Sequence, residues 1–179
     1  PGDGSGRFNY WPLRMRDAKK GAPSQEVLAP GTTEDPVQMI DVRDLADFVV
    51  HCIDKGTFGV FNAIGPKDKL GWGTCLEACK RVTKSEATLT WVPWEFLEKN
   101  QQAGDYFPIC LPPTGETAGF HRRSNAKAVA AGLKFRSVDE TVQGLLKWYD
   151  ELTPEQQGKV RAGVSLAREQ ELLMLWKKK

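Results

Sequence analysis

The chain has 179 residues, of which 40% are hydrophobic, and its 25 basic residues nearly balance its 23 acidic ones. This length suits one domain or one large lobe with a buried core, and the balanced charge, with Lys177-Lys178-Lys179 as the longest basic run, argues against a nucleic-acid partner. No stretch approaches the roughly 20 consecutive apolar residues that span a bilayer, so we expect no membrane partner.

The chain opens on Gly2, Gly4 and Gly6, which are separated by polar residues. A glycine loop cradles the phosphates of a dinucleotide when a buried strand leads into it and a helix follows it. No strand precedes these glycines in the sequence, so their spacing indicates a turn rather than a phosphate site. The sequence also starts without an initiator methionine, and we expect it to be a fragment of a longer protein.

The next predicted elements are a short helix over residues 8–16 and strands over 27–29 and 37–40. The turn sequence PGTTEDP separates the two strands, which suggests that they pair as a hairpin. An amphipathic helix is predicted from Asp44, which we expect to cap it, to Gly56. Its apolar side is expected to be buried and comprises Leu45, Phe48, Val49, Cys52 and Ile53.

The run FGVFNAIGP is rich in Val and Phe and predicts a strand over 58–65 that is buried on both faces. Thr74 is suited to cap the next helix, and the alternation in TLTWV predicts a strand with Leu89 and Trp91 on one side. A short helix is expected over 94–100. The irregular stretch GDYFPICLPPTGETAG follows, and loops of this length are often lids or binding loops.

Two capping boxes mark helix starts in the last third of the chain, SVDE from Ser137 and TPEQ from Thr153. In each, the hydroxyl accepts from the amide three residues on, and the Glu or Gln side chain reaches back to the first amide. A short helix is expected between Ser124, as its cap, and Gly132. The final predicted helix carries Leu172, Leu173 and Trp176.

The four cysteines are Cys52, Cys75, Cys79 and Cys110. They include no C-x-x-C pair, and the ligand spacings of structural zinc sites are missing, so we expect no metal site. Buried, reduced thiols are expected instead, which fits a cytoplasmic protein. His121 has no partner nearby in the sequence and is expected to be structural or exposed.

Four stretches carry a resemblance through their order and spacing. PGD matches the end of a G-P-G-D turn, and VQMIDVRDLADFVV matches a strand, a V-x-D-x-A signature and a helix through Val42, Asp44 and Ala46. GVFNAIGP matches a strand with a Y-N-x-G pattern, and AKAVAAGLKFRSVDETVQGLLKWY matches a K-x-x-x-x-L-G-W-x-P segment with its helix. Together they resemble the C-terminal part of the extended short-chain dehydrogenase/reductases, the NAD-dependent epimerase/dehydratase family.

The nearest resemblance is to a bacterial branch of that family with an R-F-x-Y-W-P stretch, here from Arg7, and an EVLAPG hairpin, here from Glu26. It implies an α/β fold that comprises the last Rossmann strand and helix plus a mainly helical substrate-binding lobe. Residues 1–152 would be the C-terminal substrate-binding part of an NAD(P)-binding Rossmann-type protein, and residues 153–179 a C-terminal helical extension. The opening glycines would be the exit turn from the nucleotide-binding half.

The resemblance places the cofactor and catalytic groups upstream of Pro1. The glycine-rich loop, the ribose selector and the Y-x-x-x-K pair of the family have no counterpart in this sequence. The parent protein would use NAD or NADP, whereas we expect no cofactor, no catalytic residue and no activity in the isolated chain. The partners implied are a small-molecule substrate, the missing N-terminal nucleotide-binding half and, in a homo-oligomer, a second copy.

The resemblance also bears on the substrate. Sugar-nucleotide members of the family carry an Arg that pairs with the diphosphate, whereas this chain has Val37 at that position and Gln38 beside it. Without this bidentate clamp, a small carbonyl or alcohol compound is a better candidate than a UDP-sugar. The expected activity of the parent is that of a reductase or epimerase. The alternatives are a non-catalytic interaction module and a truncated fragment with no activity of its own.

The candidate substrate-binding residues are Tyr10, Trp11, Arg14, Gln38 and Arg122. The first three follow the turn that, in the family, leads from the nicotinamide site into the substrate lobe. Aromatic walls with one cation suit a small polar ligand. The competing interpretation places Trp11 in the core and Arg14 in solvent.

Overall fold

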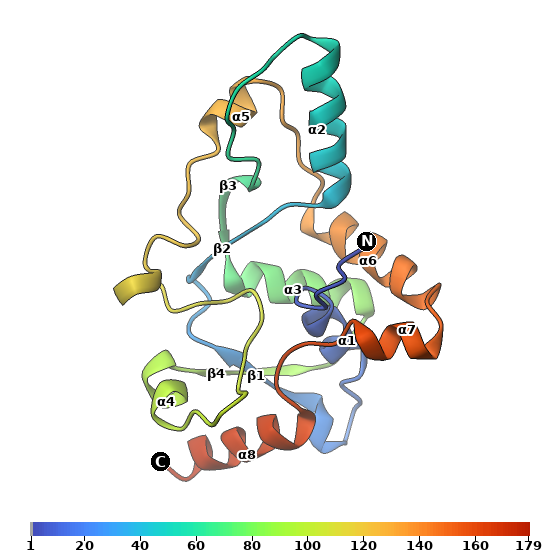
Figure 1. The fold of residues 1–179 in the computed structure, drawn as a ribbon. Coiled ribbons are helices and arrows are strands. Elements are labelled where there is room, and N and C mark those ends of the chain that lie inside the picture. Colours follow the sequence, from blue (N-terminus) through green and yellow to red (C-terminus); the bar gives the residue numbers. More distant parts are fainter. Residues whose placement is uncertain (1) are drawn as a thin grey trace.

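The computed structural model describes residues 2–179 and shows a mixed α/β fold, as the sequence predicts, whose strands form two small sheets (Figure 1). Within these residues the helices are α1 (Tyr10–Arg16), α2 (Val42–Asp54), α3 (Trp72–Thr83), α4 (Trp94–Lys99), α5 (Ala126–Ala130), α6 (Val138–Asp150), α7 (Pro154–Lys159) and α8 (Leu166–Lys177). The strands are β1 (Glu26–Pro30), β2 (Pro36–Met39), β3 (Gly65–Gly71) and β4 (Thr88–Val92), and 3-10 turns lie at Pro23–Gln25 and Gly115–Thr117.

Strands β1 and β4 form a parallel pair in which Ala29 lies opposite Trp91, and β2 and β3 form an antiparallel pair. The predicted hairpin is therefore wrong, because its two strands belong to different sheets. The turn between them explains the separation. Asp35 accepts hydrogen bonds from Thr32 Oγ1 (2.6 Å) and from Trp94 Nε1 (2.8 Å), so the turn is tied to the start of α4 instead of closing a hairpin.

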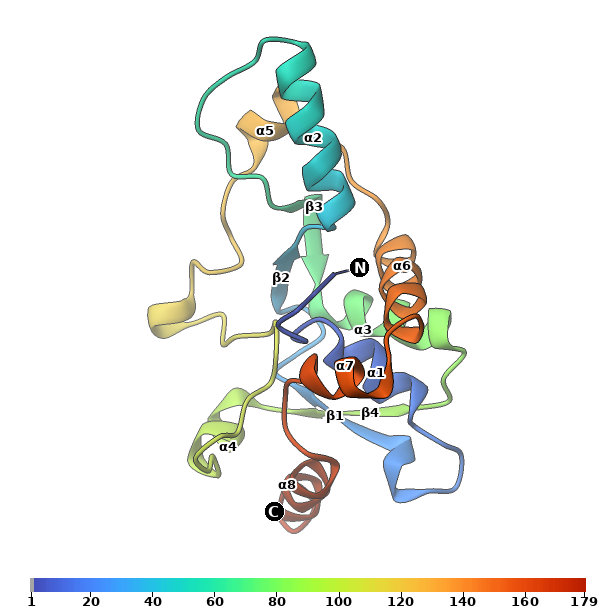
Figure 2. The same cartoon turned by 45° about the vertical axis from the view of Figure 1, so that its right-hand side comes forward.

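The β1/β4 pair is covered on both faces, as parallel strands usually are. Alternate residues of a strand point to opposite sides. Val27 and Ala29 pack in the cluster that contains α1 and α3, whereas Leu28 packs with Leu172 and Leu173 of α8. In both views the sheet lies between α1 and α3 on one side and α8 on the other (Figure 1, Figure 2). We call α1, β1, α3, β4 and α8 the body of the molecule.

Aromatic side chains fill the centre of the body. The rings of Trp11 and Trp72 meet edge to face with centroids 4.8 Å apart, and both side chains are fully buried. The predicted capping boxes are confirmed at Ser137 and Thr153, where α6 and α7 begin. The four cysteines are free thiols, and Cys52 alone among them is partly exposed.

At the end of the molecule opposite α8 lie α2, residues 57–64 and α5, which we call the arm (Figure 1, Figure 2). The N-cap of α2 is Asp41, whose carboxylate accepts from the Arg43 backbone N–H at 2.9 Å. The predicted cap, Asp44, lies within the first turn. Its carboxylate accepts instead from the backbone N–H of Arg136 (2.9 Å) and from the Arg136 guanidinium. Asp44 and Arg136 are 92 positions apart, so the sequence around Asp44 does not indicate that the two side chains pair.

The apolar side of α2 is buried only in part. Phe48 packs against Phe61 and Ala128 of the arm and against Leu133, which follows α5. The remaining large apolar side chains of the helix are exposed, and they are Val42, Leu45, Val49, Val50 and Ile53. The predicted burial of the whole stripe is therefore wrong, because residues 2–179 supply a packing surface for one side of α2 alone.

The predicted buried strand over 58–65 is also wrong. Residues 58–64 have no regular secondary structure, and β3 begins only at Gly65. Phe58 and Val60 are 81% and 84% exposed. Within residues 2–179 no strand lies beside this segment to pair with it. An apolar run therefore stays extended at the surface of the arm.

Candidate functional site

Several amides of the glycine turn that opens the chain are engaged within the turn itself. Gly2 and Gly6 adopt positive φ, which supports the predicted turn. The Asp3 carboxylate accepts from the backbone N–H groups of Ser5 (3.0 Å) and Phe8 (2.8 Å), and the Asp3 carbonyl accepts from that of Gly6 (3.1 Å). These are the groups that a pyrophosphate would need. A diphosphate bound at the turn would have to displace these bonds.

The five sequence candidates for substrate binding fall into two regions. Tyr10, Trp11 and Arg14 lie on α1 in the body. Gln38 lies on β2, Arg122 lies in the segment before α5, and both line one cavity. The structure thus brings Gln38 and Arg122 together, while Tyr10 and Arg14 line a different cavity.

Arg14 is buried, and all three nitrogens of its guanidinium donate to groups of this chain. Nε pairs with Glu169 at 2.6 Å, Nη1 donates to the carbonyl of Ser24 and Nη2 to that of Glu26, both at 2.8 Å. The second oxygen of Glu169 accepts from the Leu28 N–H at 2.8 Å. Burial raises the pKa of the Glu169 carboxyl, and the Arg14 charge opposes that rise. This ion pair thus provides hydrogen-bond partners for the Glu26 carbonyl and the Leu28 N–H, on the edge of β1 that faces away from β4.

Trp11 is a core residue, as the competing interpretation held. Its indole nitrogen donates to the carbonyl of Pro108 at 2.7 Å. Tyr10 lines a cavity of about 420 Å³ together with Tyr149 and residues 160–166. Burial raises the pKa of Tyr10 far above its ordinary value, so its phenol stays protonated. Around α1, the Tyr10 cavity is the part of the predicted site with room for a ligand.

A second cavity, of about 430 Å³, lies between β2, β3 and residues 121–125, and we call it the Gln38 cleft. Its wall is fixed by side-chain amides. The Gln38 amide donates to the Arg123 carbonyl and accepts from the Arg123 N–H, both at 2.9 Å. Asn125 donates to the carbonyls on both sides of Gly65, at 2.8 and 2.9 Å. Residues 121–125 are therefore held against both strands of this sheet.

An irregularity in the β2/β3 pairing opens the Gln38 cleft. Leu70 lies opposite Val37 and Gly65 lies opposite Met39, so six residues of β3 span three residues of β2. Residues 66–69 thus lie opposite Gln38 alone, an excess of three residues, and they line the cavity. Bulges of this kind re-aim side chains and are frequent beside functional sites.

The Gln38 cleft concentrates positive charge. Four cationic side chains and one carboxylate line it, and they are Lys67, Lys69, Arg122, Arg123 and Asp68. The Arg123 guanidinium lies over the Phe120 ring, 4.7 Å from its centroid, and donates to the Phe120 carbonyl. Within residues 2–179, the side chains of Lys67, Lys69 and Arg122 make no hydrogen bond or ion pair. Three cations of one cavity are thus free to meet a ligand.

His121 supports the same cavity from behind. Its Nδ1 accepts from the Gln38 backbone N–H at 3.0 Å, and its Nε2 donates to the Ile109 carbonyl at 2.7 Å. These two bonds require the neutral ring with the proton on Nε2. Burial lowers the pKa of His121, the Ile109 bond opposes this, and the Arg123 charge lowers the pKa further. His121 is therefore structural, as the sequence suggests, and it holds the loop at Ile109 to β2.

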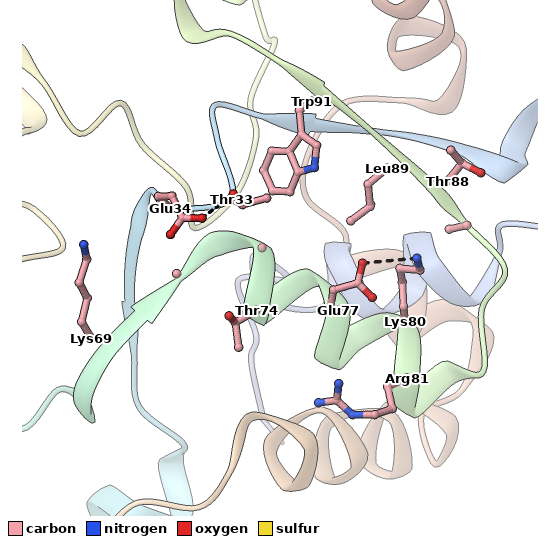
Figure 3. Close-up of a pocket in the computed structure, with 13 residues that line it drawn as sticks. Thr33, Glu34, Lys69, Thr74, Glu77, Lys80, Arg81, Thr88, Leu89 and Trp91 are labelled. Atoms are coloured by element: carbon pink, nitrogen blue, oxygen red, sulfur yellow. Dashed lines mark hydrogen bonds and ion pairs between the residues drawn. The ribbon is translucent and has the colours of Figure 1, made fainter.

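The largest cavity, of about 860 Å³, is a groove between β4 and α3 (Figure 3). Figure 3 shows Leu89 and Trp91 projecting from β4 into it. Glu77 lies 3.4 Å from Lys80, and Arg81 forms an ion pair with Asp139 outside the groove, whereas Lys69 lines both this groove and the Gln38 cleft and has no partner within residues 2–179. Compared with the Gln38 cleft, this groove offers space without a set of free, convergent charges.

Sequence reasoning missed Lys67 and Lys69 as site residues. The pattern KDK in β3 follows GVFNAIGP directly, and the strand was expected to end at Gly65. Two lysines separated by one residue in an extended segment are a usable signal, because such side chains share a face. The sequence does not indicate that Arg122 lies in the same cavity, because residues 67 and 122 come to line it together only in the folded chain.

No helix within residues 2–179 combines the length and the apolar character needed to cross a bilayer. The same part of the chain holds no group of three or more His, Cys, Asp or Glu side chains arranged to bind a metal ion. Comparison with known proteins gives no match to a family model, to a curated protein or to a solved structure.

Proposed function

We propose that the chain is the substrate-binding part of an NAD(P)-dependent reductase or epimerase of the extended short-chain dehydrogenase/reductase type, acting on a small carbonyl or alcohol compound. The observation that carries this proposal is where the apolar surface lies. The stretches that resemble the last sheet strand of the family and its preceding helix are residues 58–65 and α2. Seven of the twelve large apolar side chains that are exposed within residues 2–179 lie in these two stretches, and the other five are Tyr106, Phe120, Leu166, Met174 and Leu175.

This exposed surface is larger than scattered apolar residues at a protein surface. Five apolar side chains of α2 are exposed, and so are Phe58 and Val60 in the segment that follows the helix, while Phe48 packs against other apolar side chains. Contiguous apolar patches on soluble proteins usually mark interaction sites. A helix that is apolar on two sides fits a helix that is packed on two sides. The proposed partner is a nucleotide-binding half that covers α2 and pairs with residues 58–64.

The Gln38 cleft adjoins this surface. The Asn62 side chain donates to the Ser124 carbonyl at 3.0 Å, so the apolar segment and the wall of the cleft are bonded to each other. A partner seated on Phe58 and Val60 would therefore lie beside the cleft. This arrangement suits a substrate held by the chain and a nicotinamide held by the other half.

The side chains present in this chain indicate which steps it would perform and which the nucleotide-binding half would perform. In such an enzyme the nicotinamide supplies hydride transfer. In this chain, Gln38 fixes the wall of the cleft and Arg122 offers a cation to the substrate. Arg14 has a positioning role, since Glu169 and two carbonyls engage its guanidinium. The chain thus binds and orients the substrate, and the proton donor of the reaction belongs to the other half.

The first test is calorimetric titration of the chain with NAD⁺, NADH, NADP⁺ and NADPH. Since the glycine turn uses its own amides, we expect dissociation constants of about 1 mM or weaker for all four. A micromolar constant for any of them would place the cofactor site in this chain and overturn the proposed division.

The second test is of activity. The chain is produced together with the segment encoded upstream of Pro1, and nicotinamide absorbance is followed with a panel of small aldehydes, ketones and alcohols. We expect turnover only when both parts are present. Turnover by the chain alone would contradict the proposal by placing the catalytic groups in this chain. The absence of any upstream nucleotide-binding segment, together with no turnover, would leave an interaction module as the better description.

A further inference from the structure

We propose that the Gln38 cleft is a binding site for a compact oxyanion, a phosphate or carboxylate group, held by Lys67, Lys69 and Arg122. Binding of the anion is a property of this chain by itself. Only the conclusion that the anion is part of the substrate rests on the function proposed above.

Charge is the first observation. The whole chain carries 25 basic and 23 acidic residues, yet the cleft is lined by four cations and one carboxylate. Ion pairs engage some cations elsewhere, for example Arg14 with Glu169, Arg81 with Asp139 and Arg168 with Asp105, and what sets the cleft apart is that its cations line one concave surface. Like charges gathered in a concave surface repel one another and attract anions. An anion in the cleft would relieve that repulsion.

The chemistry of the free groups is the second observation. Lysine and arginine side chains donate hydrogen bonds and accept none. The neutral groups of the cleft are already engaged, since the Gln38 amide bonds Arg123 and the His121 ring bonds Gln38 and Ile109. Lys67, Lys69 and Arg122 are exposed to solvent, so a ligand that replaces water at these groups must supply acceptor oxygens. Phosphate and carboxylate groups do so with the matching charge, and an arginine binds either one bidentately.

Rigidity is the third observation. Arg122 lies between two residues that are fixed, because His121 bonds β2 and the strand-facing groups of Arg123 pair with Gln38. On the opposite wall β3 is held at both ends of its irregular part, because Gly65 lies opposite Met39, Leu70 lies opposite Val37, and Asn125 bonds the carbonyls on both sides of Gly65. The backbone that carries the three cations is thus in place before a ligand arrives. Such preorganisation lowers the entropy lost on binding.

The size of the cavity limits the ligand. A volume of about 430 Å³ lies within the range of small-molecule sites and toward its lower end. A small phosphorylated or carboxylated compound fits this space. This conclusion refines the expected substrate class, a small carbonyl or alcohol compound, by adding one anionic group to it.

The test is calorimetric titration of the whole chain at low ionic strength with inorganic phosphate in one arm and malonate in the other. The variant Lys67→Ala/Lys69→Ala removes two cations from the cleft, and Lys19→Ala/Lys20→Ala removes the same charge from the loop after α1 as a matched control. We expect binding of at least one anion, a loss of affinity of about tenfold or more in the cleft variant, and a change of less than about twofold in the control. Arg122→Ala should also lose about tenfold.

The titrations distinguish the type of anion from the absence of a site. Tighter binding of phosphate supports a phosphate ester as ligand, and tighter binding of malonate supports a carboxylate. No binding of either anion, or equal losses in the cleft variant and its control, would overturn the site. Turnover with uncharged carbonyls by the two-part enzyme would leave the proposed function standing even then, whereas anion binding without any nucleotide-binding half would uphold the site and reject the function.

Discussion

The body and the arm of this molecule use similar amphipathic sequences with different results. In the body, the apolar residues of α1, α3 and β1 meet one another, and Trp11, Trp72 and Leu76 are fully buried. In the arm, α2 has an equally clear apolar pattern, but Phe48 is its one buried large apolar side chain within the described residues. Periodicity thus shows which side of a helix favours burial. Whether that side is buried depends on a second segment that packs against it.

The comparison predicts that the body bears most of the stability. Trp11→Ala would remove a fully buried indole, its contact with Trp72 and its hydrogen bond to Pro108. We expect a loss of about 4 kcal/mol in the free energy of unfolding. Urea denaturation followed by circular dichroism measures this loss. Phe58→Ala in the arm is the matched control and should cost less than about 0.5 kcal/mol, and equal losses would erase the distinction between the two regions.

A somewhat smaller loss of stability is expected when the ion pair between Arg14 and Glu169, beside β1, is broken. Glu169→Ala leaves the Arg14 guanidinium buried without its partner and the Leu28 N–H without an acceptor. We expect a loss of about 3 kcal/mol in urea denaturation. The double variant Arg14→Met/Glu169→Ala should lose less than the sum of the two single variants, because the uncompensated charge is gone. Strict additivity would show that the two side chains act separately.

Within the arm, the cap of α2 gives a moderate and pH-dependent effect. Burial alone would raise the pKa of Asp41, but hydrogen bonds from the side chain and backbone of Arg43 outweigh it and lower the pKa to about 2. Since the folded pKa lies below the ordinary value of 3.8, the stabilisation is present above pH 3.8 and is lost as the pH falls toward 2. Asp41→Ala should cost about 1 kcal/mol at neutral pH. Helix content from pH 5 to pH 2 measures the transition, which should weaken in the variant.

The smallest effect on folding is expected at the exposed surface of the arm. Ile53→Ser, Phe58→Ser and Val60→Ser should each change the free energy of unfolding by less than about 0.5 kcal/mol, because these side chains are already in water. The triple variant should instead reduce the concentration-dependent self-association of the chain, which light scattering measures. If the unsubstituted chain stays monomeric at high concentration, this surface is not an interface between copies of the chain.

The sequence predicted what is decided within a few residues. The capping boxes at Ser137 and Thr153 are local, and both helices begin where they indicate. The strand TLTWV was also predicted correctly. Its parallel partner β1 was assigned to a hairpin, because nothing near residues 27–29 shows that their partner lies at 88–92.

The candidate site shows the same limit. Gln38 and Arg122 line one cavity, as a shared role in binding requires, but the lysines that accompany them were not recognised. Arg14 was placed in the substrate pocket because its partner Glu169 lies 155 residues away. Charges that meet through tertiary structure have no periodic or local signature, so their roles emerge only when the fold is known.

The bond between Glu169 and the Leu28 N–H also sets an order of events during synthesis. The two residues are 141 positions apart. At the usual speed of translation the second is made on the order of ten seconds after the first. Throughout that interval β1 exposes an unpaired edge, and Arg14 has no counter-ion. A nascent chain of this protein therefore presents its strand to chaperones or to other chains until α8 emerges and closes it.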